Sequence, residues 1–240
     1  MNESYIAEVK LKRDKVESFK EYPFSLNAVR NLNSIKLHPA VTFLIGENGS
    51  GKSTLLEAIA VAWGFNPEGG TINFNFSTRA SHSSLYEYLT LSRGVRKPVD
   101  GFFLRAESFF NVATAIDNLG VVRGYGGVSL HEQSHGESFL SLVMNRFSGN
   151  SLYILDEPEA ALSPQRQMAL ISRIHDLVND NSQFIIATHS PIIMSYPNST
   201  IYELTEKGAK KTKYTDTDHY LITKDYLNNY ENMLEILMEE

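Results

Sequence analysis

The chain has 240 residues, of which 42% are hydrophobic, and this length and composition suit one well-buried globular domain spanning residues 1–240. The absence of cysteine excludes a disulfide framework and cysteine-based zinc sites, and 28 acidic against 22 basic residues disfavour nucleic-acid binding by the surface as a whole. No apolar run is long enough to span a membrane and the charged start does not suit a signal peptide, so we expect a cytoplasmic protein without membrane insertion.

The apolar pattern predicts strands and helices in alternation, with no internal repeat or linker. In the first half of the chain we expect a strand at 41–45, a helix over 53–63, a weak strand pair over 70–79, a short helix over 85–91 and a strand at 102–104. In the second half we expect a helix over 138–147, a strand at 152–155, a helix beginning at Ser163-Pro164 and a strand at 184–187. A hairpin of 200–204 with 211–215 around Gly208 follows. Short apolar strands between helices predict an α/β fold with a mostly parallel sheet that helices cover on both faces. The basic runs at 10–15 and 207–213 are expected to be solvated.

A phosphate-binding pattern lies between the first predicted strand and the helix after it. The residues from Gly46 to Ser53 fit G-x-x-x-x-G-K-[ST], the Walker A motif, in which glycines let backbone N–H groups and a helix N-terminus surround phosphates. We predict that Lys52 reaches the β- and γ-phosphates and that the Ser53 hydroxyl binds Mg²⁺. The complete predicted phosphate loop is Gly46, Asn48, Gly49, Ser50, Gly51, Lys52, Ser53 and Thr54.

The loop GENGSGKST, with Asn at its third position, resembles the phosphate loop of ABC-type ATPases, and further motifs of that family follow in order. Residues 152–158, LYILDEP, look like its Walker B strand; the resemblance implies that Asp156 belongs to the Mg²⁺ shell and that Glu157 is the general base. His189, just after the next strand, is similar to the switch histidine that contacts the γ-phosphate. The resemblance therefore implies the P-loop NTPase fold of the ABC type and hydrolysis of Mg-ATP by Lys52, Glu157 and His189.

Two further segments carry the family resemblance with departures. The stretch QSHGES, which precedes the Walker B strand, resembles the LSGGQ signature, so Ser134, Gly136 and Glu137 are implied to bind the γ-phosphate held by a second subunit. Glu137 and the neighbouring His135 depart from the commoner Gln and Gly. Residues 160–163 occupy the place of the D-loop, with Ser163 where many members have Asp. The resemblance thus implies a homodimer that forms with ATP.

The sequence leaves two candidates for the residue near the metal and the attacking water. Glu107 stands near the position where the family usually has Gln, and we predict it as a metal-side residue, with Arg105 as the alternative. An aromatic residue at Tyr22 or Phe24 is a candidate for stacking on adenine. The short stretch between Glu107 and Ser134 implies a reduced helical subdomain.

An alternative chemistry must be weighed because residues 131–135 spell H-E-x-x-H, the zinc-protease pattern. That motif requires one continuous helix, yet glycines precede it closely and Gly136 follows at once. The available third ligands, Glu157 and Glu159, end an apolar strand that already belongs to the ATP site. We therefore favour the ATPase.

Three functions are compatible with the ATPase motifs. We favour an ATPase that acts as an ATP-gated dimeric switch on a protein or DNA partner, since FFLRAESFFN, SHGESF and LDEPEAALSP resemble small stand-alone bacterial ATPases. The ATP-binding subunit of a membrane transporter is disfavoured by the short stretch after Glu107. A nucleotide sensor that does not hydrolyse ATP is the third.

Overall fold

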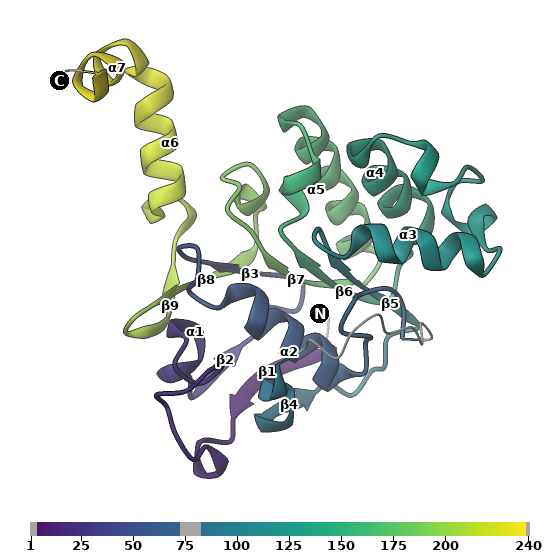
Figure 1. Cartoon of the computed structure of the whole chain (residues 1–240), viewed down its shortest axis with the longest axis horizontal. Helices are drawn as coiled ribbons and strands as arrows, with labels where there is room; N and C mark the ends of the chain where they lie inside the picture. Colours follow the sequence, from purple (N-terminus) through teal and green to yellow (C-terminus); the bar gives the residue numbers. More distant parts are fainter. Residues whose placement is uncertain (1–3, 73–82, 239–240) are drawn as a thin grey trace.

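The strand predicted at 41–45 lies inside a six-stranded sheet. The computed structural model describes residues 4–72 and 83–238, and in it β3 (Val41–Ile45) pairs in parallel with β7 (Gln183–Ala187) and with β8 (Ser199–Thr205). The order of the six strands is β5-β6-β7-β3-β8-β9, in which β5 (Asp100–Arg105) and β6 (Ser151–Asp156) are parallel and β9 (Gly208–Thr212) is antiparallel. The predicted mostly parallel sheet is confirmed (Figure 1). The predicted hairpin forms, but its second strand is 208–212 and not 211–215, so Gly208 begins that strand and pairs with Thr205.

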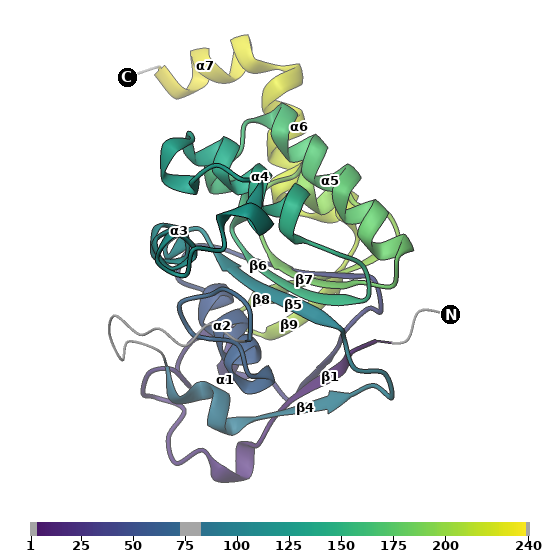
Figure 2. The same ribbon diagram turned by 90° about the vertical axis from the view of Figure 1, so that its right-hand side faces the viewer.

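Helices cover both faces of this sheet, as predicted. One face packs against α3 (Phe109–Asn118), α4 (His135–Arg146) and α5 (Pro164–Asn179), which lie on the same side of the sheet in Figure 2. The opposite face is covered by α1 (Asn27–Arg30) and α2 (Lys52–Trp63). Helix α5 begins as expected, because the Ser163 hydroxyl accepts a hydrogen bond from the N–H of Arg166 and Pro164 needs no donor at the first position.

The central strands β3, β6 and β7 are buried along their whole length and are mostly apolar. In β3, Phe43 and Ile45 belong to the core beneath α3, α4 and α5, whereas Leu44 belongs to the core around α2. In β6, Tyr153 and Ile154 divide between the same two cores. Successive side chains on a strand point to opposite faces, so a strand with helices on both sides has a nearly continuous apolar run.

A second, three-stranded antiparallel sheet was missed by the sequence analysis. Its order is β2-β1-β4, with β1 (Ile6–Leu11) between β2 (Ser34–Lys36) and β4 (Leu89–Arg93). The predicted helix over 85–91 is wrong, since only 84–88 form a 3₁₀ helix and the chain then extends as β4. Pairing with β1 overrides the local helical spacing at this point. The predicted strand pair over 70–79 lies mostly outside the described residues, and its first residue, Gly70, bridges Phe103.

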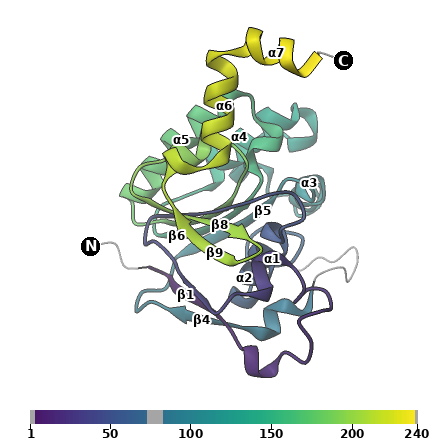
Figure 3. The ribbon, with the colours of Figure 1, turned by 90° about the vertical axis from the view of Figure 1, so that its left-hand side faces the viewer.

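The C-terminal part of the chain projects from the body as two helices, α6 (Asp218–Asn228) and α7 (Tyr230–Met238) (Figures 1 and 3). Neither helix contains a buried residue, and apolar side chains such as Leu227 and Leu237 are exposed on them. The sequence analysis left this segment unassigned. Among the described residues, no helix combines the length and the apolar character needed to cross a membrane.

Candidate nucleotide-binding site

The phosphate loop connects the end of β3 to the start of α2, as the sequence predicts. Gly46 and Gly51 have φ values of 148° and 94°, in a region that side chains with a Cβ rarely adopt. A Cβ on Gly46 would also lie 2.7 Å from the carbonyl oxygen of Leu204. The loop therefore needs glycine at these positions, and it leaves the N-terminus of α2 facing the space where phosphates would bind.

The Lys52 side chain folds back over the loop. Its Nζ donates hydrogen bonds to the carbonyl oxygens of Gly46 and Glu47, at 2.9 and 3.0 Å. Burial lowers the pKa of Lys52, and the nearby carboxylates of Glu157 and Asp156 oppose that shift. The Lys52 ammonium group thus lies beside the loop, and a phosphate group can replace the two carbonyl oxygens as its hydrogen-bond acceptor.

The Walker B strand meets the phosphate loop at the next pair of side chains. The Ser53 hydroxyl donates a hydrogen bond to Asp156 Oδ1 at 3.0 Å. Burial raises the pKa of Asp156 to about 6, although Arg105 and the Ser53 hydrogen bond act in the opposite direction. A hydroxyl and a carboxylate oxygen side by side are hard donors that suit Mg²⁺, which keeps several water or phosphate ligands of its own. These two side chains therefore fit the metal predicted from the sequence.

Glu157 follows Asp156 in a strained backbone conformation. Its φ and ψ of 49° and 53° are left-handed, which is uncommon for a residue other than glycine, and its N–H donates to the carbonyl oxygen of Ala187 at 2.9 Å. The Glu157 carboxylate is partly exposed, and its Oε1 lies 3.7 Å from Nε2 of His189. This turn aims the carboxylate away from the strand and toward the end of the next one.

His189 is held firmly by its neighbours. The backbone N–H of His189 and the hydroxyl of Thr188 donate to the Glu159 carboxylate, at 2.5 and 2.8 Å. The ring Nδ1 of His189 lies 3.2 Å from Nε2 of His219. Burial lowers the pKa of His189, helped by the Lys52 charge. The Nε2 atom is buried and has no hydrogen-bond partner within the described part of the chain, and the same is true of the Ser50 hydroxyl in the phosphate loop. Buried polar atoms without partners indicate that a polar ligand belongs here.

The predicted signature residues lie at the N-terminus of α4. Ser134 and Glu137 are exposed, and the Glu137 carboxylate accepts hydrogen bonds from both the N–H and the hydroxyl of Ser134. Gly136 is buried, and a Cβ there would lie 2.7 Å from the carbonyl oxygen of Ala161. Across residues 4–72 and 83–238, no hydrogen bond joins these residues to the phosphate loop of the same chain.

Arg105 and Glu107 differ sharply in their surroundings. The Arg105 guanidinium contacts Glu57 at 2.5 Å, Asp156 at 3.7 Å and Glu107 at 3.5 Å, and 18% of its side chain is exposed. The Glu107 side chain is 86% exposed. Arg105 therefore shapes the charge around Asp156 in this structure, whereas Glu107 is exposed and reaches the site only through its contact with Arg105. Glu57 was not singled out in the sequence, where it reads as one more polar position of a helix.

The two aromatic candidates for adenine stacking differ in their exposure to solvent. Phe24 is buried against Phe19 and Tyr88, whereas Tyr22 is 65% exposed. Phe24 belongs to the core, so only Tyr22 of this pair presents an accessible ring.

The H-E-x-x-H residues do not share a helix. His131 lies in a 3₁₀ turn that ends at Glu132, whereas His135 is the first residue of α4. The His131 ring contacts the Thr114 hydroxyl at 3.0 Å and the ring of Phe110. The spacing of one helical turn that a zinc protease requires is therefore not formed.

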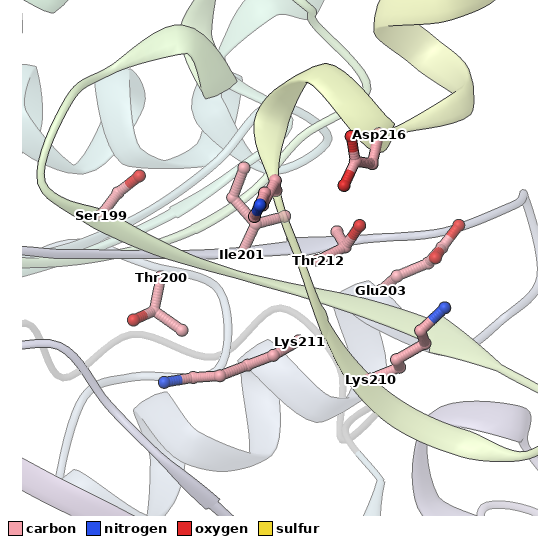
Figure 4. Close-up of a pocket in the computed structure, with 9 residues that line it drawn as sticks. Ser199, Thr200, Ile201, Glu203, Lys210, Lys211, Thr212 and Asp216 are labelled. Atoms are coloured by element: carbon pink, nitrogen blue, oxygen red, sulfur yellow. The ribbon is translucent and has the colours of Figure 1, made fainter.

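A cavity of about 440 Å³ borders the phosphate loop, and its lining includes residues that the sequence analysis missed. Besides loop residues, Asn27, Glu203 and Asp218 contribute to it. A separate open groove of about 490 Å³ lies along the β8–β9 hairpin, with Lys210 and Lys211 on opposite sides of β9 (Figure 4). These two lysines are exposed, as expected for a solvated basic run, and the groove includes no residue of the phosphate loop.

Comparisons with known proteins agree with this geometry. A family model described as an AAA domain matches residues 15–119, and one described as an AAA ATPase domain matches residues 130–194. The L-cystine transport system ATP-binding protein TcyN of Escherichia coli is 25% identical over 209 residues, which cover 74% of this chain and 82% of that protein. These matches support an ABC-type ATPase. They also support the enzyme class predicted from the sequence, an ATPase.

Two further matches are a longer sequence relative and a solved structure with a similar fold. The ABC transporter G family member STR2 of Medicago truncatula is 26% identical over 175 residues, and the chain covers only 24% of its length. Among solved structures, an SMC head bound to the C-terminal winged-helix domain of ScpA matches with a TM-score of 0.51 at 13% identity, covering 87% of this chain and 97% of that one. This likeness supports the predicted ABC-type fold.

Proposed function

We propose that this ABC-type ATPase closes as a homodimer around two Mg-ATP molecules and acts as an ATP-gated switch on a protein or DNA partner. The observation that carries the proposal is the convergence of Lys52, Asp156 and His189 at the ends of three adjacent strands. Parallel strands bring their carboxyl ends to one edge of a sheet, where ligands of open α/β folds bind.

Each residue of the proposed site has its own role in ATP hydrolysis. Lys52 and the N-terminus of α2 offset the phosphate charge, and Ser53 with Asp156 would hold Mg²⁺, with Glu107 approaching from the surface. When bound, Mg²⁺ would neutralise charge that develops on the phosphate oxygens. Glu157 orients the attacking water and accepts its proton, and His189 Nε2 donates a hydrogen bond to the γ-phosphate.

The proposal that two copies close on ATP depends on where the predicted signature residues lie. Ser134 is exposed at the start of α4, where its hydroxyl and N–H donate to the Glu137 carboxylate. An anion from outside the chain would replace this carboxylate as the acceptor at the helix N-terminus. The phosphate loop of a second copy supplies such an anion when ATP is bound. Hydrolysis removes the γ-phosphate that joins the two surfaces, so the pair then loosens.

A transporter role is a second candidate because TcyN, by its name, serves an L-cystine transport system. Against it, the stretch between Glu107 and Ser134 contains one helix, α3, and two 3₁₀ turns, so it offers little surface for a membrane partner. Affinity purification of the Glu157→Gln variant with ATP separates the candidates. An integral membrane protein in the complex supports transport, and a soluble protein or DNA supports the switch.

Release of phosphate from Mg-ATP tests the catalytic part of the proposal. We expect turnover by the wild type and loss of about 100-fold or more in Lys52→Ala, while Lys15→Ala, at an exposed position, leaves turnover unchanged. Binding of ATP without phosphate release would instead favour a nucleotide sensor. Equal turnover in all three proteins would contradict the proposed site.

A further inference from the structure

The start of α6 reaches the site through a contact between two histidines. Nε2 of His219 lies 3.2 Å from Nδ1 of His189, and the ring centroids are 5.3 Å apart. The position of His219 is anchored by Thr217, which is fully buried, accepts a hydrogen bond from the N–H of Tyr220 and donates one to the carbonyl oxygen of Tyr214. His219 is therefore presented to His189 by a fixed helix start.

A hydrogen bond between two neutral imidazoles requires one ring to donate and the other to accept. Burial lowers the pKa of both His189 and His219, which favours the neutral form of each ring near pH 7. The other nitrogen of His189, Nε2, faces Glu157 Oε1 at 3.7 Å, and a carboxylate can only accept. The proton of the His189 ring is therefore favoured on Nε2, which makes Nδ1 an acceptor and His219 the donor.

We propose that His219 is a positioning residue, whose Nε2–H donates to His189 Nδ1 and thereby holds His189 as the tautomer with its proton on Nε2. Only this tautomer of a neutral His189 donates a hydrogen bond from Nε2 to a phosphate oxygen. The inference rests on the proposed function, because it concerns how His189 meets the γ-phosphate. It also links the projecting helices α6 and α7 to the site.

Substitutions of His219 separate hydrogen bonding from packing. His219→Phe keeps a ring of similar size without a donor, and His219→Gln places an amide N–H near the position of the imidazole Nε2. We expect kcat to fall by about tenfold in the Phe variant with KM little changed, and to recover in the Gln variant to within about twofold. His175→Phe, at an exposed position on α5, is the matched control and should behave as the wild type.

Side-chain ¹⁵N NMR of the nucleotide-free protein reads the tautomer directly. The His189 signals, identified by their loss in His189→Ala, should show a proton on Nε2 in the wild type and a mixture of tautomers in His219→Phe. A wild-type His189 with its proton on Nδ1, or a Phe variant with unchanged tautomer and kcat, would overturn the inference. If His189→Ala itself hydrolyses ATP as the wild type does, the proposed function fails at His189, whatever the tautomer.

Discussion

Ser53 donates a hydrogen bond to Asp156 across 3.0 Å, although 103 positions separate the two residues in the sequence. Sheet topology explains this contact, since β7 lies between β3 and β6 and all three run in the same direction. Residues that follow parallel strands share one edge of the sheet. The serine of one motif and the aspartate of another thus meet to form the proposed metal-binding pair.

Loss of the Ser53 hydroxyl should weaken the use of Mg²⁺. In Ser53→Ala we expect turnover to fall by about 10- to 100-fold and the Mg²⁺ concentration for half-maximal activity to rise, because one oxygen ligand is lost. Ser53→Thr keeps the hydroxyl and should retain most activity. Titration of phosphate release with Mg²⁺ measures both effects, and an identical Mg²⁺ dependence in the Ala and Thr variants would contradict the assignment.

Glu159 should matter for both stability and turnover. It accepts hydrogen bonds from the Thr188 hydroxyl and the His189 N–H, so Glu159→Ala leaves two donors unpaired. We expect a loss of about 1 to 3 kcal/mol in the free energy of unfolding, together with slower hydrolysis, because the His189 loop is released. Glu159→Gln keeps an acceptor and should lose less. Denaturant unfolding and phosphate release check this, and equal losses in the two variants would argue against the hydrogen bonds as the cause.

The ion pair between Asp100 and Arg146 predicts a pH dependence of stability. Burial would raise the pKa of Asp100, but hydrogen bonds from Arg146 and the Gly101 N–H outweigh it and lower the pKa below the ordinary 3.8. A lowered carboxyl pKa stabilises the fold above the unfolded value, and this stability is lost as the pH falls through the folded value.

We therefore expect Asp100→Asn to lower the free energy of unfolding by about 1 to 2 kcal/mol near pH 7, since the pair is partly exposed. The difference from the wild type should shrink as the pH falls below 3.8. Urea unfolding across this range tests the prediction. A difference that stays constant with pH would show that packing, rather than charge, is responsible.

Gly101 should be intolerant of a side chain because β5 packs closely at that point. A Cβ there would lie 2.7 Å from the carbonyl oxygen of Leu152 and 2.8 Å from the ring of Phe65. We expect Gly101→Ala to cost about 1 to 3 kcal/mol of stability. Gly124→Ala is the matched control, since nothing lies within 4 Å of a Cβ at Gly124. Similar melting temperatures for the two variants would refute the packing argument.

The contiguous motifs and the buried strands were predictable from the sequence because each carries its chemistry in consecutive residues. The phosphate loop, the strand before Asp156 and the hairpin around Gly208 all have local patterns that match their structure. The three-stranded sheet was not predictable in this way. Its strands are only three to six residues long, and the apolar residues over 85–91 also fit a helix, so β4 becomes evident only from its pairing with β1.

The missing parts of the site have a similar cause. Glu57, Glu159 and His219 approach the motifs only after folding, and as isolated polar residues they have no pattern to set them apart. Glu159 was noticed only as an unsuitable zinc ligand. The segment that contains His219 has no family motif, so its contact with His189 could be found only in three dimensions.

Sedimentation of Glu157→Gln with and without Mg-ATP tests the central claim most directly. Removing the proposed general base should trap ATP, and we expect a dimer with Mg-ATP and a monomer without it. Ser134→Glu in the same background should prevent the dimer, because it places a carboxylate against the γ-phosphate of the second copy, whereas Ser195→Glu, at an exposed position outside the motifs, should not. Monomers under all conditions, or a dimer indifferent to Ser134→Glu, would contradict the account.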